Sequence, residues 1–181
     1  MPAAVESVFD LAFWLCDRAL NDNEYIQPIK LQYLLFLCQA YYAATNSGRK
    51  LVPAIFVAEE VGPMEPSLLK AWTNGRPKFE SKPVISEDVA KFAEEVWRRF
   101  GHHSAEHLAR LLIKMPAYLS ARKRGRRAEI RLEEVIEGLN QSSNTPKVDQ
   151  VIKPMLATPT KEIFNKLRSK LILFQKRLKF I

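Results

Sequence analysis

Residues 28–45 read PIKLQYLLFLCQAYYAAT, and this stretch decides the fold. Pro28 suits the first turn of a helix, good helix formers follow it, and the Asn-Ser-Gly sequence at 46–48 ends the run. Its most apolar part, Tyr33 to Ala44, spans 12 residues and is interrupted only by Gln39. A membrane helix needs roughly 20 apolar residues, so we predict a buried helix at the centre of a domain and no membrane span.

Helical periodicity continues on both sides of this stretch. Apolar residues at three-and-four spacing predict a helix from Val5 to Asn21, and Ser86 and Ser104 are typical N-caps for two later helices. The segment 51–61 is rich in Val, Ile and Phe and precedes a Gly62-Pro63 turn, which indicates one or two short strands. We therefore predict a mainly α, compact helical domain with a short β segment or hairpin. Further helices are predicted at 66–72, 86–100, 104–114, 116–122 and 132–139.

Composition changes near residue 139 and divides the chain into three parts. We predict a helical domain at 1–139, a polar, proline-containing linker at 140–160 and a basic amphipathic C-terminal helix at 161–181. That helix carries more apolar surface than a solvated helix should expose, so it needs a covering partner. Its own domain, a groove on a partner protein, nucleic acid and an anionic membrane surface are the alternatives. Its apolar stripe consists of Ile163, Phe164, Leu167, Leu171, Phe174, Leu178 and Ile181.

The net charge of +8 is unevenly distributed. Up to Gly138 the chain has 19 Lys and Arg against 18 Asp and Glu, and beyond it 9 against 2, so the excess lies at the C-terminal end. One local basic run is an exception, and it indicates either contacts with phosphates or an acidic partner, or a solvated loop between helices. This run consists of Arg122, Lys123, Arg124, Arg126 and Arg127.

Residues that could carry chemistry are few. Cys16 and Cys38 fall within apolar helical patterns, which indicates buried, reduced thiols in a cytoplasmic protein. His103 and His107 are spaced like a zinc pair, but no further ligand falls nearby in the sequence. The sequence has no Gly-rich phosphate loop and no nucleophile elbow, so we expect no enzyme, cofactor or metal. The N-terminal region carries Glu6 and Asp10 and has no basic leader before its first apolar stretch, so we expect no signal peptide.

Three segments, in order, resemble the Panacea domain, the SocA-like antitoxin family. IKLQYLLF at 29–36, followed by QAYY at 39–42, is similar to the family's Leu-Lys-Leu-Gln-Lys-Leu-Leu-Tyr signature. AEEVGPM at 58–64 corresponds to its Ala-Trp-x-x-Gly-Pro-Val element, with Glu59 in place of the tryptophan. VWRRFGHHSAEHL at 96–108 is similar to its helix, glycine and Ser-Ala run. The resemblance covers roughly 5–139, and where the family has Thr-His before Pro-Trp this chain has Leu112-Ile113 and then Pro116.

The resemblance implies a non-enzymatic antitoxin that binds a cognate protein toxin and, in some members, delivers it to a AAA+ protease. Gln32 also has a plainer interpretation, as a side chain that bonds backbone inside the domain, and Gly62-Pro63 as a turn. A nucleic-acid-binding regulator that uses the basic run and the basic tail is the alternative function. The residues that we expect to bind the partner are Lys30, Gln32, Glu59, Gly62, Pro63, Phe164, Leu167, Leu171 and Phe174.

Overall fold

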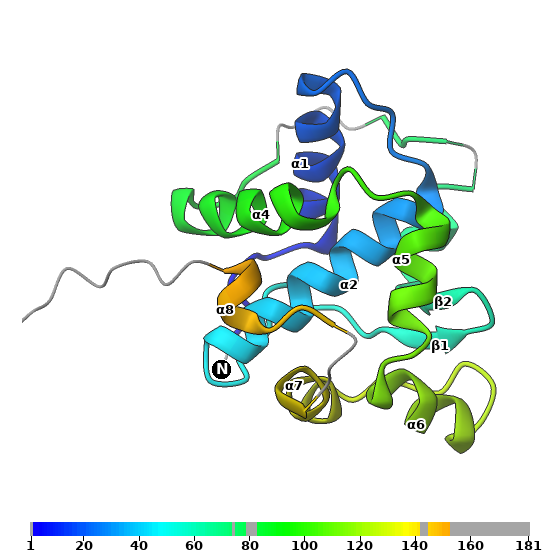
Figure 1. Cartoon of the computed structure of the whole chain (residues 1–181). Helices are drawn as coiled ribbons and strands as arrows, with labels where there is room; N and C mark the ends of the chain where they lie inside the picture. The colour runs from blue at the N-terminus through cyan, green and yellow to red at the C-terminus, as the bar shows by residue number, and fades with distance from the viewer. Residues whose placement is uncertain (1, 74, 79–82, 142–144, 153–181) are drawn as a thin grey trace, which may run out of the picture.

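The predicted fold class is confirmed by the computed structural model, which describes residues 2–73, 75–78, 83–141 and 145–152. Within these residues the chain forms eight helices and one two-stranded antiparallel sheet (Figure 1). None of the described helices is long and apolar enough to cross a membrane. The elements are α1 (Val8–Asn21), α2 (Pro28–Thr45), β1 (Val57–Glu59), β2 (Gly62–Met64), α3 (Pro66–Ala71), α4 (Glu87–Phe100), α5 (Ala105–Leu112), α6 (Pro116–Arg124), α7 (Leu132–Gln141) and α8 (Val148–Val151).

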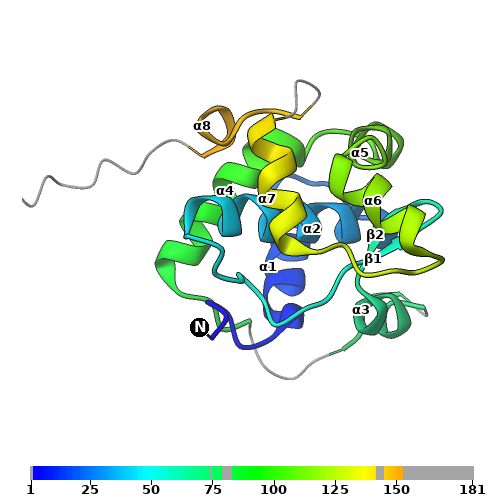
Figure 2. The ribbon, with the colours of Figure 1, turned by 90° about the horizontal axis from the view of Figure 1, so that it is seen from below.

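Helix α2 is the centre of the fold, as its sequence predicts. Every residue from Leu31 to Tyr41 is buried, and the helix contacts α1, α3, α4, α5, α7, α8 and β2. Figure 2 shows α7 lying across α2 when the molecule is seen from below. Other elements therefore pack around all sides of α2. This agrees with its sequence, because a helix that is apolar all round is buried, whereas a surface helix is apolar on one side.

Side-chain caps fix the ends of the surrounding helices. Ser86 accepts a hydrogen bond from the Val89 N–H at 3.4 Å, and Ser104 accepts one from the His107 N–H at 3.2 Å. The first helix begins at Val8 rather than at the predicted Val5, because Ser7 is its N-cap. Val5 is buried just before it, and its N–H donates to the Leu51 carbonyl at 2.8 Å.

The predicted turn at Gly62-Pro63 is wrong by two residues. Both residues lie in β2, where Gly62 pairs with Glu59 and Pro63 with Ala58, so Glu60 and Val61 form the turn. Bonded and non-bonded pairs alternate along an antiparallel ladder, and Ala58 donates its N–H away from β2 to the Ala128 carbonyl at 2.9 Å. The missing N–H of Pro63 therefore costs no hydrogen bond between the two strands.

The segment predicted as a linker carries structure in its first half. Helix α7 continues to Gln141, and α8 contacts α2 and α4. The Tyr41 hydroxyl donates to the Pro146 carbonyl at 2.7 Å, and Val151 is buried. Apolar Val148, Val151 and Ile152 at helical spacing explain this packing. The predicted C-terminal helix, 161–181, lies outside the described residues.

Candidate functional site

The structure brings four of the predicted partner-binding residues to the hairpin formed by β1 and β2. Gln32 reaches it from α2, Glu59 ends β1, and Gly62 and Pro63 belong to β2. Lys30 lies elsewhere, in an ion pair with Glu24 at 3.4 Å. The other predicted residues, Phe164, Leu167, Leu171 and Phe174, lie outside the described part of the chain.

Gln32 acts as a clamp on the strand that follows the turn. Its side-chain amide donates to the Glu65 carbonyl at 3.2 Å, and its Oε1 accepts from the Glu65 N–H at 2.7 Å. The Glu65 carboxylate then accepts from the Leu68 N–H at 2.6 Å and so caps α3. Gln32 is 1% exposed, so the interpretation of this residue as an internal backbone partner is confirmed.

Gln39 repeats this arrangement two turns later on α2. Its Oε1 accepts from the backbone N–H groups of Leu51 and Val52, at 2.9 and 3.0 Å. Gln39 and Gln32 therefore attach the two ends of the segment that contains β1 and β2 to the central helix.

Two tyrosines hold the hairpin from beneath. The Tyr33 hydroxyl donates to the Val61 carbonyl, and the Tyr118 hydroxyl donates to the Glu59 carbonyl. Burial raises the pKa of both phenols, so both remain protonated donors at neutral pH. Gly62 is required here, because its φ is +137° and a Cβ atom on it would lie 2.7 Å from Cε1 of Tyr33. Sequence reasoning missed both tyrosines as hairpin supports.

The outer surface of this hairpin is exposed and partly apolar. Val61 at the turn is 51% exposed, and its neighbour Glu60 is also exposed. Ile29, 40% exposed, precedes Tyr33 by one turn and so lies on the same side of α2. We call Ile29, Glu60 and Val61 the hairpin face. Sequence reasoning missed it, because the motif positions that it singled out point inward.

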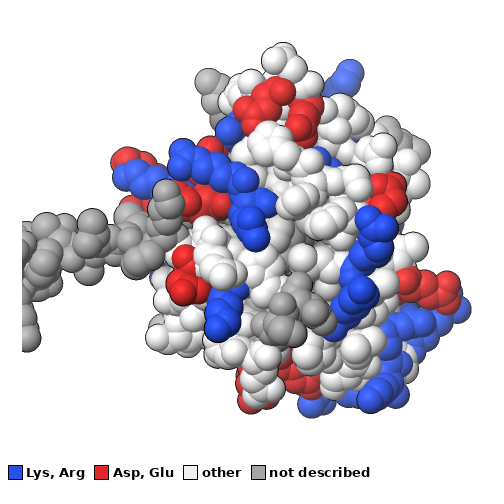
Figure 3. Space-filling model, viewed as in Figure 1, with Lys and Arg blue, Asp and Glu red and all other residues white. Residues whose placement is uncertain are grey.

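The basic run is largely engaged in contacts within the domain. Arg122 donates to the Ala58 carbonyl at 3.4 Å, Arg124 pairs with Glu134 at 2.6 Å, and Arg127 pairs with Glu59 at 2.6 Å. Lys123 and Arg126 are exposed and form no ion pair with another described residue. Figure 3 shows Lys and Arg side chains gathered over α6, at the lower right.

Two groups with potential reactivity have ordinary surroundings. The rings of His103 and His107 stack with their centroids 4.4 Å apart. The pKa of His103 is lowered, mainly by burial and secondly by repulsion from the neighbouring His107. Among the described residues, no group of three or more His, Cys, Asp or Glu side chains could hold a metal ion. Cys16 and Cys38 are free and buried, and burial raises the pKa of Cys16 to about 11 and that of Cys38 as well.

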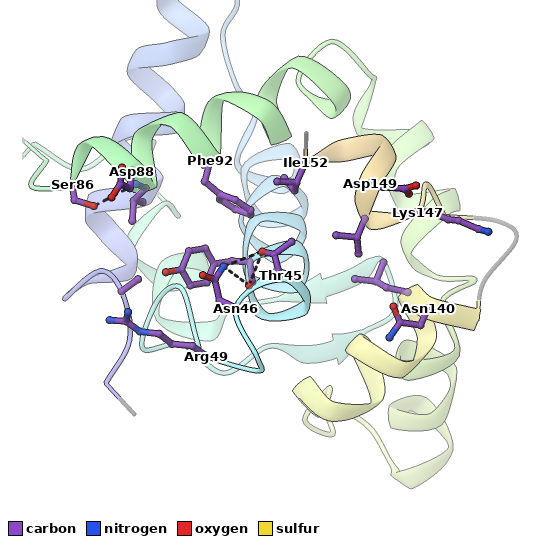
Figure 4. A pocket seen from close by; sticks show the side chains of 15 residues that line it. Thr45, Asn46, Arg49, Ser86, Asp88, Phe92, Asn140, Lys147, Asp149 and Ile152 are labelled. Carbon is purple, nitrogen blue, oxygen red and sulfur yellow. Dashed lines mark hydrogen bonds between the residues drawn. The ribbon is translucent and has the colours of Figure 1, made fainter. Parts of the chain in front are cut away.

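A groove of about 980 Å³ opens on the opposite end of α2 (Figure 4). Its walls come from the C-terminal end of α2, the N-terminal end of α4, the end of α7, and α8. Tyr42 and Phe92 form its aromatic floor, with their rings edge to face at 5.2 Å. Sequence reasoning missed this groove, because it depends on the packing of residues 145–152 against the domain.

Comparison of the chain with protein-family models, with curated proteins and with solved structures gave no match. Of the positions that carry the resemblance, Gln32 and Gly62 are explained by contacts that build this hairpin.

Proposed function

We propose that this protein is a cytoplasmic antitoxin that binds and neutralises a cognate protein toxin, and that the hairpin face contacts the toxin. One observation carries the proposal: buried side chains bond the backbone of a hairpin whose turn exposes an apolar side chain. Gln32, Tyr33 and Tyr118 hold the backbone, while Val61 and Ile29 stay exposed. The resemblance to the Panacea domain supplies the class of partner.

Rigid support matters for affinity. A turn whose carbonyls are already bonded to buried tyrosines loses little conformational freedom on binding, so more of the interaction energy appears as affinity. A side chain at the centre of an interface contributes most when neighbouring groups exclude water from it. Val61 has this rigid support, because its own carbonyl oxygen accepts a hydrogen bond from Tyr33.

The test is rescue of bacterial growth when the open reading frame next to this gene is induced. We expect the wild-type protein to rescue growth and Val61→Asp or Ile29→Asp to lose rescue, because a desolvated carboxylate at an interface centre is costly. Val84→Asp is the matched control, since Val84 is 77% exposed and lies on the loop before α4.

The outcome that contradicts the proposal is full rescue by folded Val61→Asp and Ile29→Asp proteins, with circular dichroism spectra like that of the wild type.

Delivery to a AAA+ protease is a further part of the proposal. It predicts that the half-life of the toxin falls when the antitoxin is present, whereas simple blocking leaves the half-life unchanged.

A second candidate, nucleic-acid binding, is favoured by Lys123 and Arg126, which are exposed at the end of α6 and outside the ion pairs. Each phosphate contact contributes about 0.9 to the slope of log affinity against log salt. The double variant Lys123→Ala with Arg126→Ala should therefore reduce the slope by about 2. Weak binding with no salt dependence would dismiss this candidate.

A further inference from the structure

The groove has an apolar interior and a polar rim, and the described residues leave it open. Tyr42 and Phe92 form its floor and are half-buried, and the buried Val89 and Leu139 also line it. Ile152, which follows α8, forms part of its wall. Figure 4 shows Phe92 and Ile152 near one another above the C-terminal end of α2. A concave site with apolar side chains inside and a few polar groups around it is the usual setting for a bound ligand or segment.

The path of the chain indicates which partner this is. Ile152 is the last described residue, so the 29 residues that follow it begin at the wall of the groove. Residues 161–181 carry an apolar stripe at helical spacing, and that stripe needs a cover. Groove and stripe therefore match in chemistry, and the chain joins them.

We propose that segment 161–181 of this chain binds in the groove as an amphipathic helix, with its apolar stripe against Tyr42 and Phe92. The eight residues 153–160 can span at most about 29 Å, which is enough for the segment to return to a groove that begins at Ile152. A short tether gives an effective concentration in the millimolar range, so weak intrinsic affinity suffices for docking.

Charge at the rim agrees with this occupant. Asp88 and Asp149 are exposed on opposite walls, and the stripe is flanked by seven Lys and Arg against one Glu162 in 161–181. Two basic residues also line the groove. The Arg49 guanidinium donates to the carbonyls of Pro2 and Ala3 at 3.0 and 3.2 Å, whereas Lys147 is exposed on the same wall as Asp149. Asp88, on the α4 wall, therefore remains available to the basic flanks of the segment.

This inference concerns the chain alone and does not depend on toxin binding. It assigns the apolar residues of the tail, Phe164 and Leu167 among them, to the groove while no partner is present. A toxin that uses the tail would then compete with the groove for the same stripe.

Trypsin tests the proposal on the full chain, because the segment is rich in cleavage sites such as Lys166 and Lys170. Where opening is fast, proteolysis reports the open population, so a docked segment should be cleaved about tenfold more slowly than a synthetic 153–181 peptide. Phe92→Glu should remove this protection, and Val84→Glu, the exposed control, should retain it.

A variant of the tail guards against misfolding of the groove variant. Leu171→Glu lies outside the described body of the domain and should remove protection to the same extent as Phe92→Glu. Cleavage of the wild-type tail as fast as that of the free peptide overturns the proposal. Protection that disappears on dilution also overturns it, because it shows docking into a second copy, and protection that survives both variants shows a different cover for the stripe.

Discussion

Replacing Gln32 with Met tests whether the motif glutamine builds the hairpin. Methionine has a similar length and volume, so the replacement removes the hydrogen bonds while leaving little cavity. It leaves the N–H of Glu65 without its partner, which lies at 2.7 Å in the wild type, beside a side chain that is 1% exposed. The Glu65 carbonyl loses its bond from Gln32, at 3.2 Å, but keeps the one from the Leu69 N–H at 3.0 Å.

A buried backbone group left unsatisfied costs about 1–3 kcal/mol, so Gln32→Met should lower the free energy of unfolding by roughly 1–3 kcal/mol. For a chain of this size that corresponds to a fall in Tm of about 2–12 °C. Urea unfolding followed by circular dichroism measures the change, and hydrogen exchange should show loss of protection at the Glu65 amide. Gln27→Met is the control, because Gln27 is exposed and makes no side-chain cap bond.

A change in unfolding free energy for Gln32→Met below about 0.5 kcal/mol, equal to that for the control, would refute the clamp. Unchanged exchange at the Glu65 amide would lead to the same conclusion. Either result would mean that packing of the hairpin against α2, and not the paired hydrogen bonds, positions the strands.

Three further predictions follow from the contacts described. Gly62→Ala should destabilise the fold by several kcal/mol more than Gly125→Ala in urea unfolding, because both have positive φ but Gly62 alone faces an aromatic ring. Two hydrogen bonds from Arg18, at 2.6 and 3.2 Å, hold the pKa of Glu94 below its usual 4.5. This stabilisation is complete above pH 4.5 and is lost as pH falls through the folded-state pKa, so Glu94→Gln should flatten the acid limb of a stability profile. With its pKa near 11 and its side chain buried, Cys16 should react with a thiol reagent at pH 7 only on unfolding; rapid labelling of the native protein would contradict this.

Most of the fold can be predicted from the sequence, because local signals and burial agree. The apolar run at 28–45 marks the central helix, and Ser86 and Ser104 cap the helices that the periodicity predicts. The turn could not be placed, since Gly62-Pro63 is a turn signal by composition. In the folded protein, the Tyr33 ring and the alternation of strand bonds put both residues in β2.

The candidate site was harder to predict than the fold. Gln32 and Gly62, which face inward, could be selected from the sequence because they match the motifs that carry the resemblance. The sequence carries no signal for Val61 or Ile29, since an exposed aliphatic residue has no pattern of its own. The groove depends on long-range packing of residues 145–152, which periodicity within a short segment does not report.

This division between inward and outward residues decides how the function must be tested. A variant of Gln32 or Gly62 that fails in the growth-rescue assay for the proposed function would be uninformative, because both residues hold the hairpin and their loss disturbs the fold first. Val61 and Ile29 are exposed, so their replacement can abolish binding at little cost in stability. Because Gln32 and Gly62 are buried, specificity for the proposed partner must be sought in the exposed residues next to them.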